Sequence, residues 1–414
     1  MRHTLSTIAI VVALGTLLLA QSGTKPPAPV SGTPVTRGSV VGVQPQPAPA
    51  AAIAWMEIAK TPPMGWNSWN KFACNVSEVL IREVADAMVA TGMKSAGYQY
   101  IVIDDCWQVS RDAEGQILPD AKRFPAGMKA LADYVHGKGL KFGLYSDAGA
   151  RTCEGRPGSN GYEALDAQQY AAWGVDYLKY DWCSNEGVDP KLAYTTMRNA
   201  LRATGRPILF SLCEWGSNKP WEWARGIGHM WRTTGDISDT WRSWTRLLDQ
   251  QAELYKYAGP GGWNDPDMLE VGNGGMSLAE YRAHFSMWSM LAAPLIAGND
   301  IRSMTPEIKG VLTNTDVIAI DQDPLGRQAR KIRDDGDYEV WARPLQGGDW
   351  AVALLNRGAA AHEVAVAWVE IGMGASAAPK VRDLWTKQEY GAVKTIFAPV
   401  VPSHDVVVVR VSPS

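Results

Sequence analysis

A short apolar run that ends in polar or charged residues recurs eight times along this chain. Successive runs begin roughly 25 to 40 residues apart, which is the length of one β-α unit. Eight such units predict an α/β fold of the (β/α)8 TIM-barrel type. A doubly wound open sheet is the alternative, but no glycine-rich phosphate turn follows the first run. The runs are residues 64–67, 100–105, 141–147, 175–181, 207–214, 230–236, 262–267 and 294–300.

Amphipathic helical patterns lie between the runs. One covers residues 77–90, with Ser77 as the expected N-cap, and another covers 128–136 and ends at the glycines that follow. After Asp323-Pro324 the helical pattern is replaced by short strand-like segments separated by turn glycines. We therefore predict a catalytic barrel over 55–327 and a C-terminal antiparallel β-sandwich domain over 328–414. Its expected strands are 338–344, 350–356, 362–369, 381–385 and 406–411.

The N-terminus has the features of a secretory signal peptide. Polar Arg2 and His3 precede an apolar stretch over 8–20, which is short for a membrane span, and small residues follow it. We expect a signal over 1–21, with an uncleaved anchor as the alternative. Residues 22–54 are rich in Pro, Gly and Ala and predict a linker without regular structure. These features predict a secreted or periplasmic protein that leaves the membrane once its signal is cleaved.

Two of the runs end on an aspartate with a cation beside it. Lys179 and Asp181 share one face of a predicted strand, because side chains alternate along it. Asp236 ends a second run that also contains Arg232. Structural ion pairs are the simpler explanation of each pair alone. Two carboxylates on separate strand ends of one barrel are, however, what glycoside hydrolysis needs, one as nucleophile and one as acid/base. We expect Lys179 to lower the pKa of Asp181, and the acid/base carboxyl to have a raised pKa.

Further side chains at the run ends suit sugar binding. Asp104 and Asp105 can accept hydrogen bonds from sugar hydroxyls, although either could serve only as a loop or capping acid. Tryptophans can stack on the apolar face of a sugar, although most of the 18 in the chain are expected in the core. The tryptophans at or beyond run ends are Trp66, Trp107, Trp182, Trp215 and Trp263.

Composition and motifs exclude other classes. Lys+Arg 40 against Asp+Glu 43 give a net charge of −3, which argues against nucleic acid or an anionic membrane as a partner. No pair of the six histidines has zinc-ligand spacing, and no serine-hydrolase elbow or nucleotide-binding loop occurs, so we expect no metal or cofactor. The five cysteines of an exported chain allow two disulfides and one thiol, but their spacing leaves the pairing open.

An ordered set of short motifs closely resembles the α-galactosidase/α-N-acetylgalactosaminidase family, glycoside hydrolase family 27 of clan D. The motifs follow the family order from about residue 57 to 325. They are Pro63-Met64-Gly65-Trp66-Asn67-Ser68-Trp69, Asp104-Asp105-Cys106-Trp107, Tyr145-Ser146-Asp147-Ala148-Gly149, Thr152-Cys153, Leu178-Lys179-Tyr180-Asp181, Cys213-Glu214-Trp215-Gly216, Trp231-Arg232 with Asp236-Ile237, and Trp263-Asn264-Asp265-Pro266-Asp267-Met268-Leu269.

The resemblance implies that Asp181 is the nucleophile and Asp236 the acid/base of a retaining α-galactosidase. It implies disulfides Cys74–Cys106 and Cys153–Cys183. Trp182 departs from the family pattern, since many relatives have a small or polar residue there, and this departure leaves the shape of the aglycone side open. The galactose pocket that it implies is lined by Trp66, Asp104, Asp105, Tyr145, Cys153, Lys179, Glu214, Trp215, Arg232 and Met268.

The expected substrate is a carbohydrate with a terminal α-linked galactose, in an oligosaccharide, a polysaccharide branch or a glycoconjugate. Within the family the alternatives are α-N-acetylgalactosaminidase and β-L-arabinopyranosidase. From another class, the alternative is a non-catalytic sugar-binding barrel. The sequence predicts no oligomeric state.

Overall fold

The computed structural model describes residue 55 and residues 57–413. The predicted signal at 1–21 and the predicted linker at 22–54 lie outside the described residues. Within the described part of the chain, no helix is long and apolar enough to cross a membrane.

Eight parallel strands form the first sheet, in the order β10-β1-β2-β5-β6-β7-β8-β9. The sheet closes into a barrel where Leu269, just beyond β9, forms a parallel bridge with Ala297 of β10. Every strand lies within one of the eight predicted runs. The strands are β1 (Met64–Asn67), β2 (Tyr100–Val102), β5 (Lys141–Asp147), β6 (Tyr177–Asp181), β7 (Leu209–Cys213), β8 (Met230–Arg232), β9 (Trp263–Asp265) and β10 (Leu295–Ala297).

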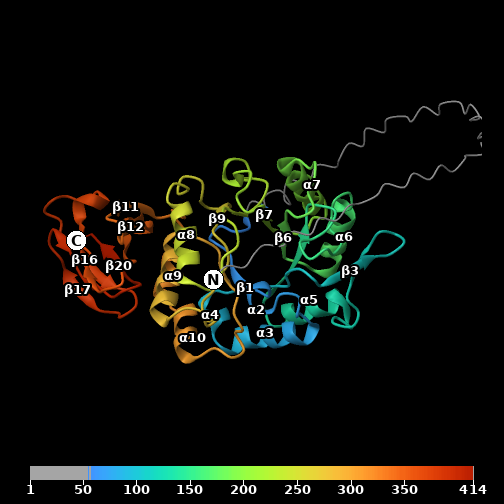
Figure 1. Ribbon diagram of the computed structural model, residues 1–414, viewed down its shortest axis with the longest axis horizontal. Helices are drawn as coiled ribbons and strands as arrows, with labels where there is room; N and C mark the ends of the chain where they lie inside the picture. Colours follow the sequence, from blue (N-terminus) through green and yellow to red (C-terminus); the bar gives the residue numbers. More distant parts are fainter. Residues whose placement is uncertain (1–54, 56, 414) are drawn as a thin grey trace, which may run out of the picture. The chain divides into compact units, whose positions relative to one another are not determined.

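Helices surround these strands (Figure 1). Ser77 caps α3 as expected, because its side chain accepts a hydrogen bond from the backbone of Leu80. The connection from β7 to β8 differs from the expected pattern, since it contains only a 3-10 turn, η1 (Pro220–Glu222). The helices are α2 (Trp69–Phe72), α3 (Glu78–Ala90), α4 (Met93–Ala96), α5 (Gly127–Gly137), α6 (Glu163–Trp173), α7 (Pro190–Ala203), α8 (Trp241–Gln251), α9 (Leu278–Met290), α10 (Pro306–Leu312) and α11 (Thr315–Asp321), and a hairpin of β3 (Gln108–Arg111) and β4 (Ile117–Pro119) follows β2.

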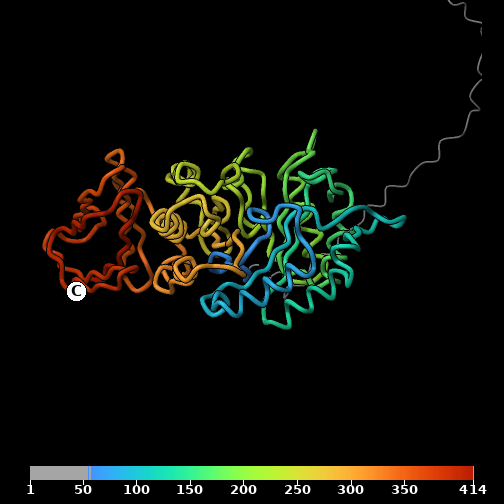
Figure 2. The backbone as a smooth tube through the Cα atoms, turned by 60° about the horizontal axis from the view of Figure 1, so that its bottom comes forward, coloured from blue at the N-terminus to red at the C-terminus, as the bar shows by residue number. Residues whose placement is uncertain are grey.

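A six-stranded antiparallel sheet follows the barrel, in the order β11-β12-β13-β20-β16-β17. Two short ladders, β14–β19 and β15–β18, complete this β-sandwich (Figure 2). Only part of the strand expected over 362–369 forms, since it divides into two short strands and a 3-10 turn. The elements are β11 (Arg330–Asp334), β12 (Tyr338–Pro344), β13 (Trp350–Asn356), β14 (His362–Glu363), β15 (Val366–Ala367), β16 (Lys380–Asp383), β17 (Glu389–Ala392), β18 (Ile396–Phe397), β19 (Val400–Val401) and β20 (Asp405–Ser412), with turns η2 (Gln346–Gly348) and η3 (Trp368–Ile371).

Both faces of this second sheet are buried. One face packs with the ladders around Val352, Trp368 and Val409. The other packs on α9, whose residues from Ala283 to Met290 are all buried. At this contact Arg343 donates to the backbone oxygen of Ser289 at 2.9 Å. The barrel and the β-sandwich are therefore joined by an apolar contact through α9, the helix between β9 and β10 in the chain.

Candidate active site

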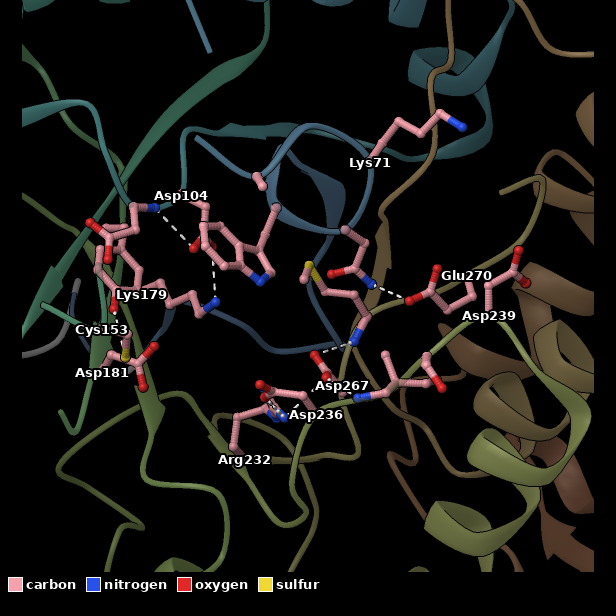
Figure 3. Close-up of a pocket in the computed structure, with 18 of the residues that line it drawn as sticks. Lys71, Asp104, Cys153, Lys179, Asp181, Arg232, Asp236, Asp239, Asp267 and Glu270 are labelled. Carbon is pink, nitrogen blue, oxygen red and sulfur yellow. Dashed lines mark hydrogen bonds and ion pairs between the residues drawn. The ribbon is translucent and has the colours of Figure 1, made fainter. Parts of the chain in front are cut away.

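A pocket of about 570 Å³ opens at the carboxyl ends of the barrel strands (Figure 3). This is the end at which barrel enzymes place their chemistry. Side chains that follow six different strands line it. Of the residues singled out from the sequence, those that line it are Asp104, Asp105, Tyr145, Cys153, Lys179, Asp181, Trp215, Arg232, Asp236 and Met268.

Lys179 and Asp104 form a buried ion pair at the pocket. The Lys179 ammonium lies 2.8 Å from the Asp104 carboxylate, which also accepts a hydrogen bond of 2.7 Å from the Asn67 amide. Burial alone favours the neutral amine, but the charges of Asp104 and Asp181 hold the pKa of Lys179 above its usual range. The pocket therefore has a fixed positive charge beside Asp181.

Asp181 ends β6 and faces the pocket with only 5% of its surface exposed. Register places it between Asp147 of β5 and Cys213 of β7. Burial raises the pKa of Asp181 to about 6, Lys179 and Arg232 lower it, and Asp104 raises it. The expected effect of Lys179 is thus present, but desolvation outweighs it.

Arg232 connects two carboxylates on neighbouring segments. Its Nη2 lies 3.0 Å from an oxygen of Asp236 and 3.0 Å from an oxygen of Asp267. Asp236 has 71% of its side chain exposed, whereas Asp267 is almost fully buried. The guanidinium therefore holds an open carboxylate at the mouth of the pocket and a buried one in its wall.

Asp105 and the loop that carries Cys153 form another part of the wall. Asp105 accepts hydrogen bonds from the backbones of Cys106 and Glu154, at 2.6 and 3.0 Å. Burial raises the pKa of Asp105 above its usual value. The Tyr145 hydroxyl donates to the Cys153 sulfur at 3.4 Å.

The cysteine pairs are those implied by the family resemblance. Cys74 is bonded to Cys106, and Cys153 to Cys183. Both bridges tie loops that follow barrel strands next to the pocket. Cys213 is buried and reduced. Two groups of side chains with the ligand types of a metal site each contain disulfide-bonded cysteines, which have no thiolate to offer a metal.

Trp66 and Glu214 are absent from the pocket lining, although the resemblance implies them there. The Trp66 indole donates to the backbone oxygen of Asn299 at 2.7 Å. Glu214 accepts two hydrogen bonds from Asn218, at 2.7 and 2.6 Å, while its other oxygen is buried without a partner in the described structure. Both side chains therefore lie behind the pocket wall.

The tryptophans at the run ends also divide into one that lines the pocket and others that are buried. Trp215 alone among those five lines the pocket. Trp107 and Trp263 are fully buried, and Trp182 stacks on Tyr194 with ring centroids 5.6 Å apart. The indole ring of Trp182, a residue whose effect on the aglycone side the sequence leaves open, is therefore part of the core packing.

Several lining residues were not identified from the sequence. Trp69 and Asp267 lie inside motifs quoted above, so these two residues could have been identified from the family resemblance. The others follow strand ends by three or more residues, beyond the reach of a strand-end argument. The added residues include Trp69, Asn70, Lys71, Asp239, Asp267, Glu270 and Asn273.

Comparison with known proteins decides the family. The family "Alpha galactosidase A" matches residues 61–323, and "Alpha galactosidase C-terminal beta sandwich domain" matches 335–411. The chain belongs to the α-galactosidase A family. This family consists of glycoside hydrolases, and its two matched regions correspond to the barrel and to the β-sandwich.

Similar proteins span nearly the whole chain. "Alpha-galactosidase A" of Cellvibrio japonicus is 53% identical over 386 residues, covering 88% of this chain and 95% of that protein. The crystal structure of α-galactosidase I from Mortierella vinacea is 40% identical with a TM-score of 0.84, covering 86% of this chain and 97% of that one. The α-galactosidase of Saccharomyces cerevisiae, solved with raffinose, is 33% identical with a TM-score of 0.84, covering 87% and 99%.

Proposed function

We propose that this α-galactosidase family member releases terminal α-D-galactose by double displacement, with Asp181 as nucleophile and Asp236 as acid/base. The observation that carries the proposal is the placement of these two carboxylates in one pocket, the first buried beside Lys179 and the second open at the mouth. One carboxylate attacks carbon 1 of the sugar while the other protonates the departing oxygen.

The environment of each carboxyl group suits its role. Asp181 attacks as the carboxylate, which Lys179 and Arg232 stabilise. Attack on the anomeric carbon forms a galactosyl ester and breaks the glycosidic bond, and the leaving oxygen takes the proton of Asp236. Asp236 then returns as a base that deprotonates the water that hydrolyses the ester.

The remaining wall residues suit recognition of galactose. Asp104 and Asp105 are charged acceptors for sugar hydroxyls, and Lys179 and Arg232 are donors. Glu214 remains a candidate for selecting between a hydroxyl and an acetamide at C2 of the sugar. It does not line the pocket itself, so it would act through the neighbouring Trp215, which does. A raffinose complex of the yeast relative is consistent with a galactoside in this pocket.

A panel of nitrophenyl glycosides tests the assignment. The purified protein is expected to hydrolyse the α-galactoside fastest. If the α-N-acetylgalactosaminide or the β-L-arabinopyranoside is hydrolysed faster, the protein is instead an α-N-acetylgalactosaminidase or a β-L-arabinopyranosidase, respectively. Absence of any turnover by folded protein would leave only a sugar-binding role.

We also propose that the protein is exported, to the periplasm or the medium, after cleavage of a signal over 1–21. Two disulfides fit an oxidising compartment. Intact mass spectrometry of secreted protein without reductant is expected to show a start beyond the signal and one alkylatable thiol, Cys213. Five alkylatable thiols or a retained N-terminus would contradict the proposal.

A further inference from the structure

Asp147 ends β5 and lies in one of the motifs quoted above, but the proposed reaction does not use it. Its side chain is fully buried and does not line the pocket. In the sheet it is the register partner of Asp181, which ends the neighbouring strand β6. Among the described residues, Asp147 takes part in no ion pair. A buried carboxyl group without a cationic partner costs folding free energy, so its hydrogen bonds have to offset that cost.

The two oxygens of Asp147 accept hydrogen bonds from the backbones of two different loops. One accepts from the N–H of Gly149 at 2.7 Å, within the loop that follows β5. The other accepts from the N–H of Cys183 at 2.9 Å, in the loop that follows β6 and two residues beyond Asp181. The first bond forms a local turn within its own loop, whereas the second crosses between the strands. Asp147 therefore ties the end of β5 to the segment that follows Asp181.

The loops after β5 and β6 are in direct backbone contact. The N–H of Ala148 donates to the backbone oxygen of Asp181 at 2.9 Å. A Cβ atom added at Gly149 would lie 1.9 Å from the backbone oxygen of Cys183, so there is no free space between the two loops. The disulfide Cys153–Cys183 joins the same loops. The segment after Asp181 is therefore held at several points from the side of β5.

The same segment also contacts the carboxylate of Asp181. The backbone N–H of Trp182 donates to an oxygen of Asp181 at 3.0 Å. Because Trp182 and Cys183 are adjacent in the chain, a shift of the Cys183 N–H group also displaces the N–H group of Trp182. Nucleophilic attack needs aligned reacting atoms about 3–3.5 Å apart, and a misplacement on the order of 1 Å can cost about 100-fold in rate. The backbone that Asp147 holds is therefore placed to orient the Asp181 carboxylate.

The position of Asp147 also has an electrostatic cost. Burial and the charge of Asp181 raise the pKa of Asp147 to about 8, although its two backbone donors lower it. Carboxyl groups with strongly shifted pKa values are concentrated at functional sites. An amide of the same shape would avoid the cost of ionisation. It has only one acceptor oxygen, however, and two N–H groups point at this side chain.

We propose that Asp147 is a positioning residue for the nucleophile, because its carboxyl group holds the backbone that follows Asp181 and thereby orients the Asp181 carboxylate. The inference rests on the proposed function, since it takes Asp181 as the nucleophile. Asp147 does not line the pocket, so its loss should slow the attack on the sugar and leave the binding of galactose unchanged.

The test uses 5-fluoro-α-galactosyl fluoride, which reports on the attack by Asp181. A carboxylate oxygen of Asp181 bonds to carbon 1, and the bond from carbon 1 to fluorine breaks and releases fluoride, which needs no proton from Asp236. The remaining fluorine slows hydrolysis of the ester, so peptide mass spectrometry can locate the label. The inactivation rate constant then measures the attack, and the Ki of free galactose measures binding.

Asp147→Asn keeps an acceptor for Gly149 but turns an NH2 group toward the N–H of Cys183. We expect inactivation to slow on the order of 10- to 100-fold, with an unchanged galactose Ki. Asp176→Asn is the matched control. Asp176 lies just before β6 and accepts from the N–H of Phe142 in β5 at 2.9 Å, so it links the same two strands at their opposite ends. This control is expected to lower the stability in urea and to keep the inactivation rate.

An unchanged inactivation rate in Asp147→Asn would overturn the proposal. A galactose Ki that rises in parallel, or the same slowing in Asp176→Asn, would overturn it too, because either result indicates a general loss of structure. If Asp147→Asn does not fold, Asp147→Ser decides, since a serine hydroxyl can still form the turn with Gly149 and only the bond to Cys183 is lost. Slower inactivation with an unchanged Ki then supports the proposal, and an unchanged rate refutes it. A wild type that is not labelled at Asp181 would instead refute the proposed function.

Discussion

Asp267 accepts a hydrogen bond of 2.8 Å from the backbone N–H of Ile237, the residue that follows Asp236. Asp267 also pairs with Arg232, which pairs with Asp236. Its backbone has a φ of 91°, a region that L residues other than Asn and Asp seldom adopt. Two links therefore run from a buried, conformationally restricted residue to the open carboxyl of Asp236.

We infer that Asp267 positions Asp236. Asp267→Asn preserves the backbone preference but removes the charge that balances Arg232. We expect kcat/KM to fall for substrates with poor leaving groups, which need a well-placed acid, and to fall less for dinitrophenyl α-galactoside. The measurement is the fold loss in kcat/KM on a substrate with a poor leaving group, divided by the fold loss on dinitrophenyl α-galactoside. A uniform loss would indicate a role in sugar binding or in general stability instead.

The two catalytic aspartates are expected to fail in different ways. Asp181→Gly should abolish turnover of all galactosides, because no nucleophile is left to form the ester. Asp236→Asn should impair raffinose by about 10²-fold or more and activated aryl galactosides less. Steady-state kinetics on both substrates measures this. Equal losses for Asp236→Asn would contradict its role as the general acid.

The sequence predicted most of this site because strand ends and motifs coincide. Alternation on one strand was enough to bring Lys179 and Asp181 to the same face, and the structure has both in the pocket. Glu270 could not be found this way. Its carboxylate accepts a hydrogen bond from the amide of Asn70, which lies 200 residues away in the sequence. The burial of Trp66, Trp107 and Trp263 was equally hidden, since a tryptophan at a strand end can face the core or the solvent.

The predicted effect of Lys179 on Asp181 is confirmed, since its charge lowers the pKa of that carboxyl, but the larger effect of burial could not be predicted for a related reason. The charge of Lys179 is visible in the sequence, whereas the depth of burial is a property of the assembled barrel. Desolvation raises the pKa of Asp181 to about 6. Attack requires the carboxylate, so activity should be lost as the pH falls through this value.

We therefore expect the acidic limb of the kcat/KM profile to have an apparent pKa near 6, falling about tenfold per pH unit below it. Lys179→Met removes a charge that lowers the pKa of Asp181, so the limb should move to higher pH, in addition to any loss of affinity. An acidic limb that stays in place in Lys179→Met would contradict this assignment.

Stability in acid should depend on His229. Burial lowers the pKa of this imidazole to about 4. Its Nδ1 accepts from the Phe210 backbone at 2.9 Å, and its Nε2 faces the Trp55 backbone oxygen at 3.0 Å. Because the folded pKa is depressed, the stability from neutral His229 is complete above pH ~6.5 and is lost as the pH falls toward 4.

Urea unfolding at pH 7 and pH 4.5 measures this loss. The wild type is expected to lose on the order of 2 kcal/mol more than His229→Asn, whose amide oxygen can still accept from Phe210 but does not titrate. Equal losses in the two proteins would show that other groups control acid stability.

The C2 position is expected to set substrate preference within the family. We expect a strong preference for α-galactoside over α-N-acetylgalactosaminide, and we expect Glu214→Ser to narrow it by making room behind the wall for the acetamide. The ratio of kcat/KM on the two nitrophenyl sugars measures this. An unchanged ratio in Glu214→Ser would exclude Glu214 as the selecting residue.

The configuration of the first sugar released shows directly whether Asp181 forms a covalent intermediate. Double displacement through Asp181 inverts carbon 1 twice, and it requires the two carboxyl groups to lie about 5–5.5 Å apart. Proton NMR during early hydrolysis of an α-galactoside distinguishes the anomers before they equilibrate. We expect α-galactose to appear first. Initial release of β-galactose would contradict a galactosyl-Asp181 intermediate.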